Sequence, residues 1–303
     1  MKTPRRTGPL ALLRDRLEAL GIRPRKRHGQ NFLLDRNQVL AVCRDARLRP
    51  GDLVLEVGPG SGLLSREIAR SGAGLLAVEI DPKLARLVRE ETAPFPQVLV
   101  LEADILLRKN RLRPEVLARL SALIEERGGG ALKCVSNLPY SIAAPFLANL
   151  VADERPWEVG VFMLQREVAE RLTATPGSPA YGALSVGIQL ATARREILRA
   201  VPPEVFWPRP RVESAVARME FYPAAERAAL PWDALRRVIR SVFSARRKTL
   251  RNALAGLLPR QGKRAAESLL DRFGYDPRSR GENLAPHDFL RVARALSETS
   301  NRS

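Results

Sequence analysis

The amino-acid sequence predicts an α/β fold, in which a doubly wound and mostly parallel sheet precedes a small domain built only of helices. Short apolar runs alternate with helical patterns through the middle of the chain, as expected of strands joined by crossover helices. The first of these runs ends in a glycine-rich turn that opens a helix. Beyond residue 223 only helical spacing remains, and 303 residues suffice for one large and one smaller domain.

Five apolar runs are expected to form parallel strands: Leu53–Val57, Gly74–Glu79, Val98–Leu101, Ala131–Ser136 and Val159–Leu164. Helices with a period of 3.6 residues are expected between them, among them Leu63–Arg70, Leu84–Glu91 and Glu115–Glu126. Strands separated by helices pair in parallel through right-handed crossovers, which gives a doubly wound sheet. Two further extended runs are expected to complete the sheet as an antiparallel edge, Glu196–Val201 and Ser214–Phe221.

Both ends of the chain are expected to be helical. A proline start and a glycine stop predict a helix from about Pro9 to Leu20, ended by Gly21. After Pro223, helical spacing covers Trp232–Leu258, Lys263–Phe273 and Pro286–Leu296. We therefore divide the chain into a basic N-terminal helical arm (1–47), a sheet domain (48–223) and a basic helical domain (224–303).

The positive charge is concentrated in the two terminal segments. Residues 1–47 hold 12 Lys and Arg against 4 Asp and Glu, and residues 224–303 hold 17 against 8. The segment between them is nearly neutral, with 22 against 21, within a formal net charge of +18. Basic ends around a neutral centre indicate a surface for a polyanion, and we expect nucleic acid as the partner.

Composition excludes several classes of protein. A hydrophobic content of 45% argues against a disordered chain, and no run of 18 apolar residues lacks a charge, so no membrane span is expected. Two cysteines and two histidines supply neither a disulfide framework nor a metal site. The apolar stretch Pro9–Leu13 ends at Arg14 without a cleavage site, so we expect no secretory signal and a soluble, cytoplasmic protein.

The turn Glu56–Gly62 directly follows the first expected strand. Gly58 and Gly60 let the backbone approach a ligand closely, and the helix behind them offers the positive potential of its N-terminus. A dinucleotide fingerprint would place a third glycine at Leu63, and Pro59 lacks an N–H that a pyrophosphate would use. The turn therefore argues against NAD as the cofactor.

Carboxylates follow the next two strands. Glu79 lies 21 residues after Gly58, where a carboxylate can accept hydrogen bonds from both hydroxyls of a ribose. Asp104 follows the third strand, where it could accept from an adenine amino group. Each acid alone is more often a solvated strand-end residue, but three signals on successive strand ends favour an adenosine-bearing cofactor. Without a phosphate cradle, S-adenosylmethionine fits best.

The fourth strand ends in the sequence Asn137-Leu138-Pro139-Tyr140. Asn and Pro at a strand end are usually only a turn, but beside a methyl donor they have a chemical use. The Asn137 amide oxygen and the Leu138 carbonyl could accept both N–H bonds of an adenine amine, which localises its lone pair toward the methyl group. Pro139 would hold the turn, and Tyr140 would offer a face for an extruded base.

These motifs resemble those of the KsgA-type family of small-subunit ribosomal RNA adenine dimethyltransferases. The resemblance covers about residues 20–295 and rests on Arg25–Leu33, Glu56–Gly62, Val78–Asp81, Asp104, Asn137–Tyr140, Phe206–Ser214 and Phe243–Asn252. It implies a Rossmann-like methyltransferase sheet with a C-terminal helical domain. It also implies N6,N6-dimethylation of two adjacent adenosines in the loop of the 3′-terminal rRNA hairpin.

The resemblance also implies roles for single residues. Asn31 and Leu33 would close over the methionine end of the cofactor, Gly58 would lie against it, and Asn137 would stand where cofactor and target meet. Phe206 is similar to the aromatic residue of the family that contacts the target base, and a core Phe before a Pro-rich loop is an equal alternative.

The chain departs from the family pattern in three places. Pro179 and Ala183 occupy positions where basic residues are common, and His28 replaces a more typical apolar residue. The stretch between Asp104 and Asn137 is longer than usual and carries a basic run, Arg108–Arg113.

The Trp232–Leu258 segment combines an apolar stripe with a basic face. Such a face is ordinarily solvated, but cations without acidic partners favour contacts to RNA phosphates, which position a protein without reading bases. The residues we assign to this surface are Arg236, Arg240, Arg246, Arg247, Lys248 and Arg251.

Three other functions stay open at this point. The related large-subunit rRNA dimethyltransferase of macrolide resistance shares fold and chemistry, but the segments Pro208–Ser214 and Phe243–Asn252 argue against it. A ribosome-assembly factor would act mainly by binding immature small subunits. A DNA adenine methyltransferase is a weaker candidate, because it would normally need a separate sequence-reading domain. We expect a monomer.

Overall fold

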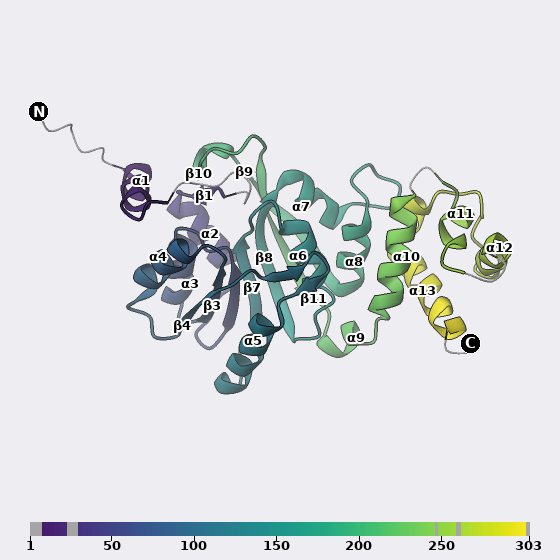
Figure 1. The fold of residues 1–303 in the computed structure, drawn as a ribbon, viewed down its shortest axis with the longest axis horizontal. Coiled ribbons are helices and arrows are strands. Elements are labelled where there is room, and N and C mark those ends of the chain that lie inside the picture. The colour runs from purple at the N-terminus through teal and green to yellow at the C-terminus, as the bar shows by residue number, and fades with distance from the viewer. Residues whose placement is uncertain (1–7, 23–29, 246–247, 259–261, 301–303) are drawn as a thin grey trace, which may run out of the picture. The chain divides into compact units, whose positions relative to one another are not determined.

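The computed structural model describes residues 8–22, 30–245, 248–258 and 262–300. A seven-stranded sheet has the order β4-β3-β2-β7-β8-β11-β9 (Figure 1). Its strands are β2 (Leu53–Val57), β3 (Gly74–Glu79), β4 (Val98–Glu102), β7 (Leu132–Asn137), β8 (Trp157–Gln165), β9 (Thr192–Val201) and β11 (Ser214–Phe221). The five expected parallel strands and both later strands are confirmed, with small shifts of their ends.

Parallel pairing joins β4, β3, β2, β7 and β8 in that order. β11 pairs with β8 in antiparallel register, from Ser214 opposite Gln165 to Glu220 opposite Val159. β9 lies beyond β11, so the two later strands close this side of the sheet. The predicted doubly wound fold is therefore confirmed.

Helices connect the parallel strands. They are α3 (Leu63–Arg70), α4 (Pro82–Thr92), α5 (Pro114–Arg127) and α6 (Ala143–Leu150), while α2 (Arg36–Asp45) precedes β2 and α7 (Arg166–Thr173) follows β8. Proline occupies the first turn of α4 and of α5. Backbone N–H groups in a first turn have no acceptor within the helix, so the N–H that proline lacks costs no hydrogen bond. A core of Val, Leu, Ile and Ala side chains from α2, α3 and the sheet is almost completely buried.

The strand order reverses between β2 and β7. From β2 the chain proceeds outward through β3 to β4, and it then returns to β7 and proceeds to β8 in the opposite direction. Right-handed crossovers in opposite directions place their helices on opposite faces, which leaves a crevice where the two directions diverge. The turn after β2 and the turn after β7 both lie at this crevice.

Two small ribbons flank the sheet. β1 (Phe32–Leu33) pairs with β10 (Phe206–Trp207), and β5 (Leu106–Arg108) pairs with β6 (Arg111–Leu112). The N-terminal helix, α1 (Pro9–Ala19), confirms the prediction for this segment.

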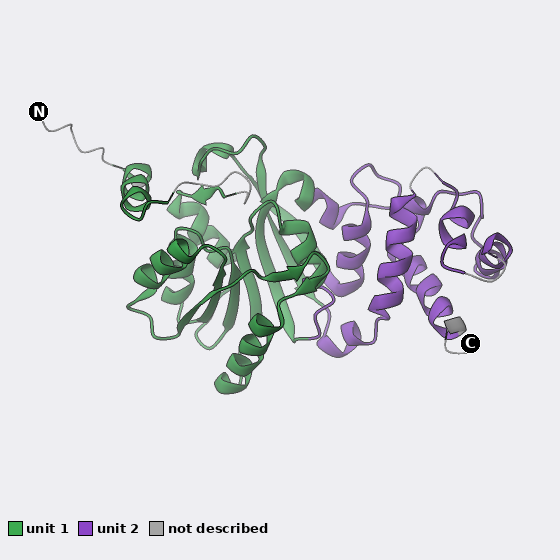
Figure 2. Cartoon of the chain, viewed as in Figure 1, with its two compact units in different colours: residues 1–149, 155–169, 194–221 green, residues 150–154, 170–193, 222–303 purple. Residues whose placement is uncertain are grey.

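The chain divides into two compact units (Figure 2). Unit 1 contains residues 1–149, 155–169 and 194–221, and unit 2 contains residues 150–154, 170–193 and 222–303. Unit 2 therefore includes a segment, 170–193, that precedes the boundary we expected near residue 223. The three-part division of the sequence analysis remains a proposal.

Unit 2 is helical. It holds α8 (Ala183–Ala191), α9 (Ala224–Ala228), α10 (Trp232–Ser244), α11 (Leu250–Ala255), α12 (Gly262–Arg272) and α13 (Pro286–Ser300). Its core is built from residues of α8, α10, α11, α12 and α13. Within this core the Phe243 ring stacks on the Phe289 ring, with 5.7 Å between their centroids. Short 3₁₀ turns lie at Pro203–Val205 in unit 1 and Gly281–Asn283 in unit 2.

The expectation of continuous helical spacing over Trp232–Leu258 is wrong. α10 ends at Ser244, and α11 begins only at Leu250. Thr249 forms a bridge with Arg280, and the Leu250 N–H donates to the Ser279 carbonyl at 2.8 Å. These tertiary contacts outweigh the helical periodicity of the sequence.

Candidate active site

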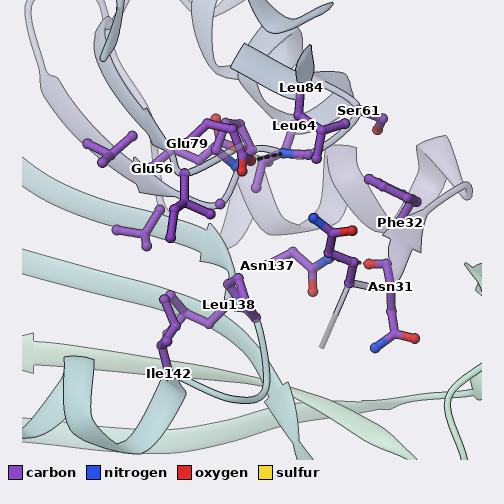
Figure 3. Close-up of a pocket in the computed structure, with 18 of the residues that line it drawn as sticks. Asn31, Phe32, Glu56, Ser61, Leu64, Glu79, Leu84, Asn137, Leu138 and Ile142 are labelled. Carbon is purple, nitrogen blue, oxygen red and sulfur yellow. Dashed lines mark hydrogen bonds between the residues drawn. The ribbon is translucent and has the colours of Figure 1, made fainter. Parts of the chain in front are cut away.

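A cavity of about 250 Å³ lies at the carboxyl ends of the parallel strands in unit 1 (Figure 3). Five stretches of chain line it: residues 30–33, the turn after β2, the end of β3, the residues after β4 and the turn after β7. It therefore occupies the switch point of the sheet, where open α/β sheets bind their ligands. The predicted site residues Glu79, Asp104 and Asn137 lie at these same strand ends.

Gly58 and Gly60 give the turn after β2 its close contacts. Both have positive φ values, 68° and 57°, which L side chains rarely adopt. A Cβ atom on Gly58 would lie 2.7 Å from Pro139 Cγ, and one on Gly60 would lie 3.1 Å from Phe32 Cδ1. Glycine at these positions lets the turn pack directly against the other two walls of the cavity.

Glu79 is held in one orientation beneath this turn. Its Oε2 accepts from the Gly60 N–H at 3.1 Å, as Figure 3 shows, and its Oε1 accepts from the Asp81 N–H at 3.0 Å. Burial raises the pKa of Glu79, and the backbone hydrogen bonds act in the opposite direction. A carboxylate oxygen has more than one lone pair, so both atoms can still accept from ligand hydroxyls.

Asp104 lines the cavity at the end of the stretch after β4. Its Oδ1 accepts from the Leu106 N–H at 2.9 Å, which fixes the side chain. Its Oδ2 has no hydrogen-bond partner among the described residues. The apolar side chains of Ile80 and Ile105 line the same cavity, and they can flank a flat ring. Neither residue had a predicted role, because an apolar residue at a strand end is typical of an ordinary core position.

Glu56 is a third residue of the cavity that had no predicted role. It lines the cavity, is 1% exposed and accepts from Ser65 Oγ at 2.6 Å. Desolvation by burial raises the pKa of Glu56 to about 8, with a further contribution from the Glu79 carboxylate. An acidic residue inside an otherwise apolar strand was the available signal.

Asn137 ends β7 and lies across the cavity from Glu79. Its Nδ2 donates to the Asn31 backbone carbonyl at 3.2 Å, and Figure 3 shows the Asn137 side chain beside the Asn31 backbone. Because the amide nitrogen is engaged, the amide oxygen is left to accept from a ligand. Leu138 and Pro139 also line the cavity, and the Leu138 N–H donates to the Met163 carbonyl at 3.1 Å.

Tyr140 lines the cavity after Pro139. Its hydroxyl shares a hydrogen bond with Ser214 Oγ at 2.6 Å, so β11 fixes the ring from the side opposite the turn. Burial raises the pKa of this phenol. The structure thus brings together Asn137, Leu138, Pro139 and Tyr140 with every residue predicted to bind the cofactor.

Phe206 lies apart from this group. It is 3% exposed and pairs with Leu33 across the β1–β10 ribbon. It belongs to the hydrophobic core of the sheet, and it is absent from the cavity lining. Its role as a contact to the target base stays a prediction, and its packing agrees with the alternative of a core residue.

The N-terminal arm supports the wall formed by Phe32. The Phe32 ring stacks on Trp207 with 6.2 Å between centroids, and the Arg14 guanidinium lies 5.0 Å from the centroid of Trp207. Arg16 forms an ion pair with Glu91 of α4, and Leu17 is buried beside Phe32. The helical pattern of α1 did not predict that it packs at this position.

The predicted RNA-binding residues lie in unit 2. Arg236 and Arg240 are on α10, and no described residue forms an ion pair with either. Arg251 is on α11 and pairs with Glu267 Oε2 at 3.5 Å, so the expectation of a face without acidic partners is wrong for this residue. Lys248 is exposed between the two helices, and Arg246 and Arg247 lie outside the described residues.

The cavity has the donors and acceptors that an adenosine-bearing sulfonium needs. The glycine turn lets the protein backbone come close to a ligand, Glu79 and Asp104 stand at the ends of consecutive strands, and Asn137 presents an amide oxygen. Together with the sheet order, these features define a Rossmann-like methyltransferase that uses S-adenosylmethionine.

Comparison with known proteins identifies the family. The family model described as ribosomal RNA adenine dimethylase matches residues 21–298. A ribosomal RNA small subunit methyltransferase A from Pelotomaculum thermopropionicum is 40% identical over 286 residues, which cover 93% of this chain and 95% of that protein. The chain belongs to the ribosomal RNA adenine dimethylase family.

Solved structures share the fold. A dimethyladenosine transferase from Plasmodium falciparum matches with a TM-score of 0.71 at 20% identity, over 89% of this chain and 98% of that one. The 23S rRNA methyltransferase ErmE matches with a TM-score of 0.58 at 26% identity, over 88% of this chain and 100% of that one.

The described residues contain no group of three or more His, Cys, Asp or Glu side chains arranged to hold a metal ion. Within the same residues, no helix has both the length and the apolar character to cross a membrane.

Proposed function

We propose that this protein transfers methyl groups from S-adenosylmethionine to N6 of two adjacent adenosines in the 3′-terminal hairpin loop of 16S rRNA. The product would be N6,N6-dimethyladenosine, formed during ribosome biogenesis. The observation that carries the proposal is the Asn137 amide, which lines the cavity with its nitrogen engaged by Asn31 and its oxygen available. The name of the Pelotomaculum relative supports the small-subunit substrate.

Cofactor binding would use the edge formed by the three strand ends. When bound, S-adenosylmethionine supplies an electrophilic methyl carbon on a sulfonium. Glu79 would accept from the ribose hydroxyls and Asp104 from the adenine amine, while Asn31, Leu33 and the turn of Gly58 and Gly60 would surround the methionine end. Because the backbone already fixes both carboxylates, little side-chain entropy is lost on binding.

Asn137 and Leu138 would activate the target amine. An adenine amine is a poor nucleophile, because its lone pair is delocalised into the ring. The Asn137 amide oxygen and the Leu138 carbonyl would accept its two N–H bonds and draw the nitrogen toward a tetrahedral geometry. The nitrogen would take the methyl carbon as the carbon–sulfur bond breaks, so that S-adenosylhomocysteine leaves as a neutral thioether, and the methylated nitrogen would release one proton to water. Tyr140 would stack on the extruded base.

RNA binding would use cations outside the cavity. Arg236, Arg240 and Lys248 would contact phosphates, together with the predicted contacts at Arg246, Arg247 and Arg251. We further propose that the protein is a cytoplasmic monomer and that its partner is the immature small subunit.

Nucleoside mass spectrometry tests the product and the substrate together. The full-length protein is incubated with labelled S-adenosylmethionine and either small or large subunits that lack adenine dimethylation. We expect dimethyladenosine only in small-subunit rRNA, at two adjacent positions located by primer extension. Label in the large-subunit rRNA alone would instead support the macrolide-resistance type of activity, and no label in either would leave only a binding role in assembly.

A further inference from the structure

The β5–β6 hairpin carries a charge that the methyl-transfer chemistry does not use. Arg108, Lys109 and Arg111 are exposed, and none of them forms an ion pair with another described residue. Arg108 and Arg111 lie directly opposite each other in the antiparallel register. Like charges in directly opposed positions destabilise a ribbon. An anion bound between them would remove that repulsion.

The hairpin is nevertheless held firmly at its base. Asp104 accepts twice, from the Leu106 N–H at its carboxylate and from Arg113 Nε at its carbonyl, at 2.9 and 2.6 Å. The Arg113 N–H donates to the Ile105 carbonyl at 2.9 Å. Leu106 and Leu112 are buried, at 9% and 6% exposure.

The turn of the hairpin is also anchored. Asn149 Nδ2, on α6, donates to the Lys109 carbonyl at 3.0 Å. A two-stranded ribbon is marginally stable alone, so these tertiary bonds are what hold the three cations in place. Their backbone positions are therefore fixed before any ligand arrives.

Both anchors belong to segments that form the cavity. Asp104 and Ile105 line it directly, and α6 begins one residue after the lining residue Ile142. A strand of three residues extends about 10 Å. The cations therefore lie on a short, fixed arm that starts at the wall predicted to hold the cofactor adenine.

We propose that this hairpin binds phosphate groups of the RNA strand that carries the target adenosines. The inference rests on the proposed function and adds a binding surface in unit 1 to the cations of unit 2. Arginine guanidinium groups match phosphate oxygens in a bidentate geometry, which lysine does not offer. Such contacts fix the register of the strand without reading its bases, and they place the adenosine at the cavity entrance.

The test compares two triple variants of the full-length protein. R108Q/K109Q/R111Q removes the hairpin charge, and R70Q/R86Q/R89Q removes the same charge from exposed residues of α3 and α4, outside the two basic terminal segments. Those residues lie in the later turns of the two helices, which lead away from the strand ends that form the cavity. The dissociation constant for small ribosomal subunits that lack the modification is measured by fluorescence anisotropy between about 0.05 and 0.3 M KCl.

We expect the hairpin variant to bind subunits at least tenfold more weakly at about 0.15 M salt, with the control within twofold of wild type. The magnitude of the slope of the logarithm of the association constant against the logarithm of the salt concentration should fall by about two to three, and only for the hairpin variant. Unchanged affinity for S-adenosylmethionine shows that both variants fold. Equal behaviour of the two variants would overturn the proposal. Because binding is measured without methyl transfer, a wild type that binds but does not methylate would count only against the proposed function.

Discussion

The polar side chains at the cavity edge of unit 1 differ from those on the basic surface of α10 in unit 2 in whether they have partners within the chain. At the cavity, Glu79 and Asn137 each have partners within the chain that fix their orientation. On α10, Arg236 and Arg240 have none among the described residues. Fixed groups can be aimed at one bond of a reacting molecule. Free cations can follow the phosphates of a large substrate, and their contributions add up instead of depending on one geometry.

Replacement of Asn137 should give the largest effect. Asn137→Ala removes a preorganised acceptor from the site of methyl transfer, and we expect kcat to fall about 100-fold or more. Affinity for S-adenosylmethionine should change little, because Glu79 and Asp104 remain. Initial rates on small subunits and calorimetric titration of the cofactor measure the two quantities.

Asn37→Ala is the matched control, since Asn37 is exposed on α2 and its side chain forms no hydrogen bond with another described residue. Its kcat should equal that of wild type. A wild-type rate for Asn137→Ala would show that the amide does not act on the target amine.

Glu56 should give an intermediate effect, on stability instead of binding. Its pKa is raised to about 8 in the folded protein, from an ordinary value of 4.5. The folded state therefore holds this proton more tightly than the unfolded state. The resulting stabilisation is complete below about pH 4.5 and is lost as the pH rises through 8, which costs roughly 2 kcal/mol between pH 6 and 8.

Glu56→Gln keeps an acceptor for Ser65 but does not titrate. The free energy of unfolding of this variant should therefore decline less steeply between pH 6 and 8 than that of wild type, as measured by urea denaturation. Glu158→Gln, at an exposed position of β8, should keep the wild-type slope. Identical slopes for all three proteins would mean that Glu56 is already ionised in the folded state.

The basic surface should give the smallest effect for each residue. Arg236→Gln together with Arg240→Gln removes two candidate phosphate contacts. The magnitude of the slope of the logarithm of the association constant against the logarithm of the salt concentration should therefore fall by about 1.4 to 1.8. We expect several-fold weaker binding of small subunits at about 0.15 M salt and no change in cofactor affinity. A loss of cofactor affinity would show that the two regions are not separable.

The sequence predicted the cavity edge better than the RNA surface, and the reason is physical. Strand periodicity and a glycine turn fix where Glu79, Asp104 and Asn137 lie, because parallel strands present their carboxyl ends at one edge. The contacts of Phe32 with Trp207 and Gly60 join segments distant in sequence, so no local pattern contains them.

The same limit explains the errors in unit 2. Helical periodicity ran through residues 245–249, but pairing of Thr249 with Arg280 interrupts the helix. The ion pair of Arg251 with Glu267 likewise depends on how α11 and α12 pack. Charge counts can predict that a segment is basic, but they cannot show which of its cations already have a partner.

The most direct test is a crystal structure of the protein with S-adenosylhomocysteine and adenosine. The decisive measurement is the distance from Asn137 Oδ1 to N6 of the adenosine. We predict a hydrogen bond of about 3 Å, with the cofactor ribose on Glu79 and the Asn137 nitrogen still bonded to the Asn31 carbonyl. An adenosine amine held elsewhere, with the Asn137 amide turned away from it, would contradict the assignment of this residue and the chemistry derived from it.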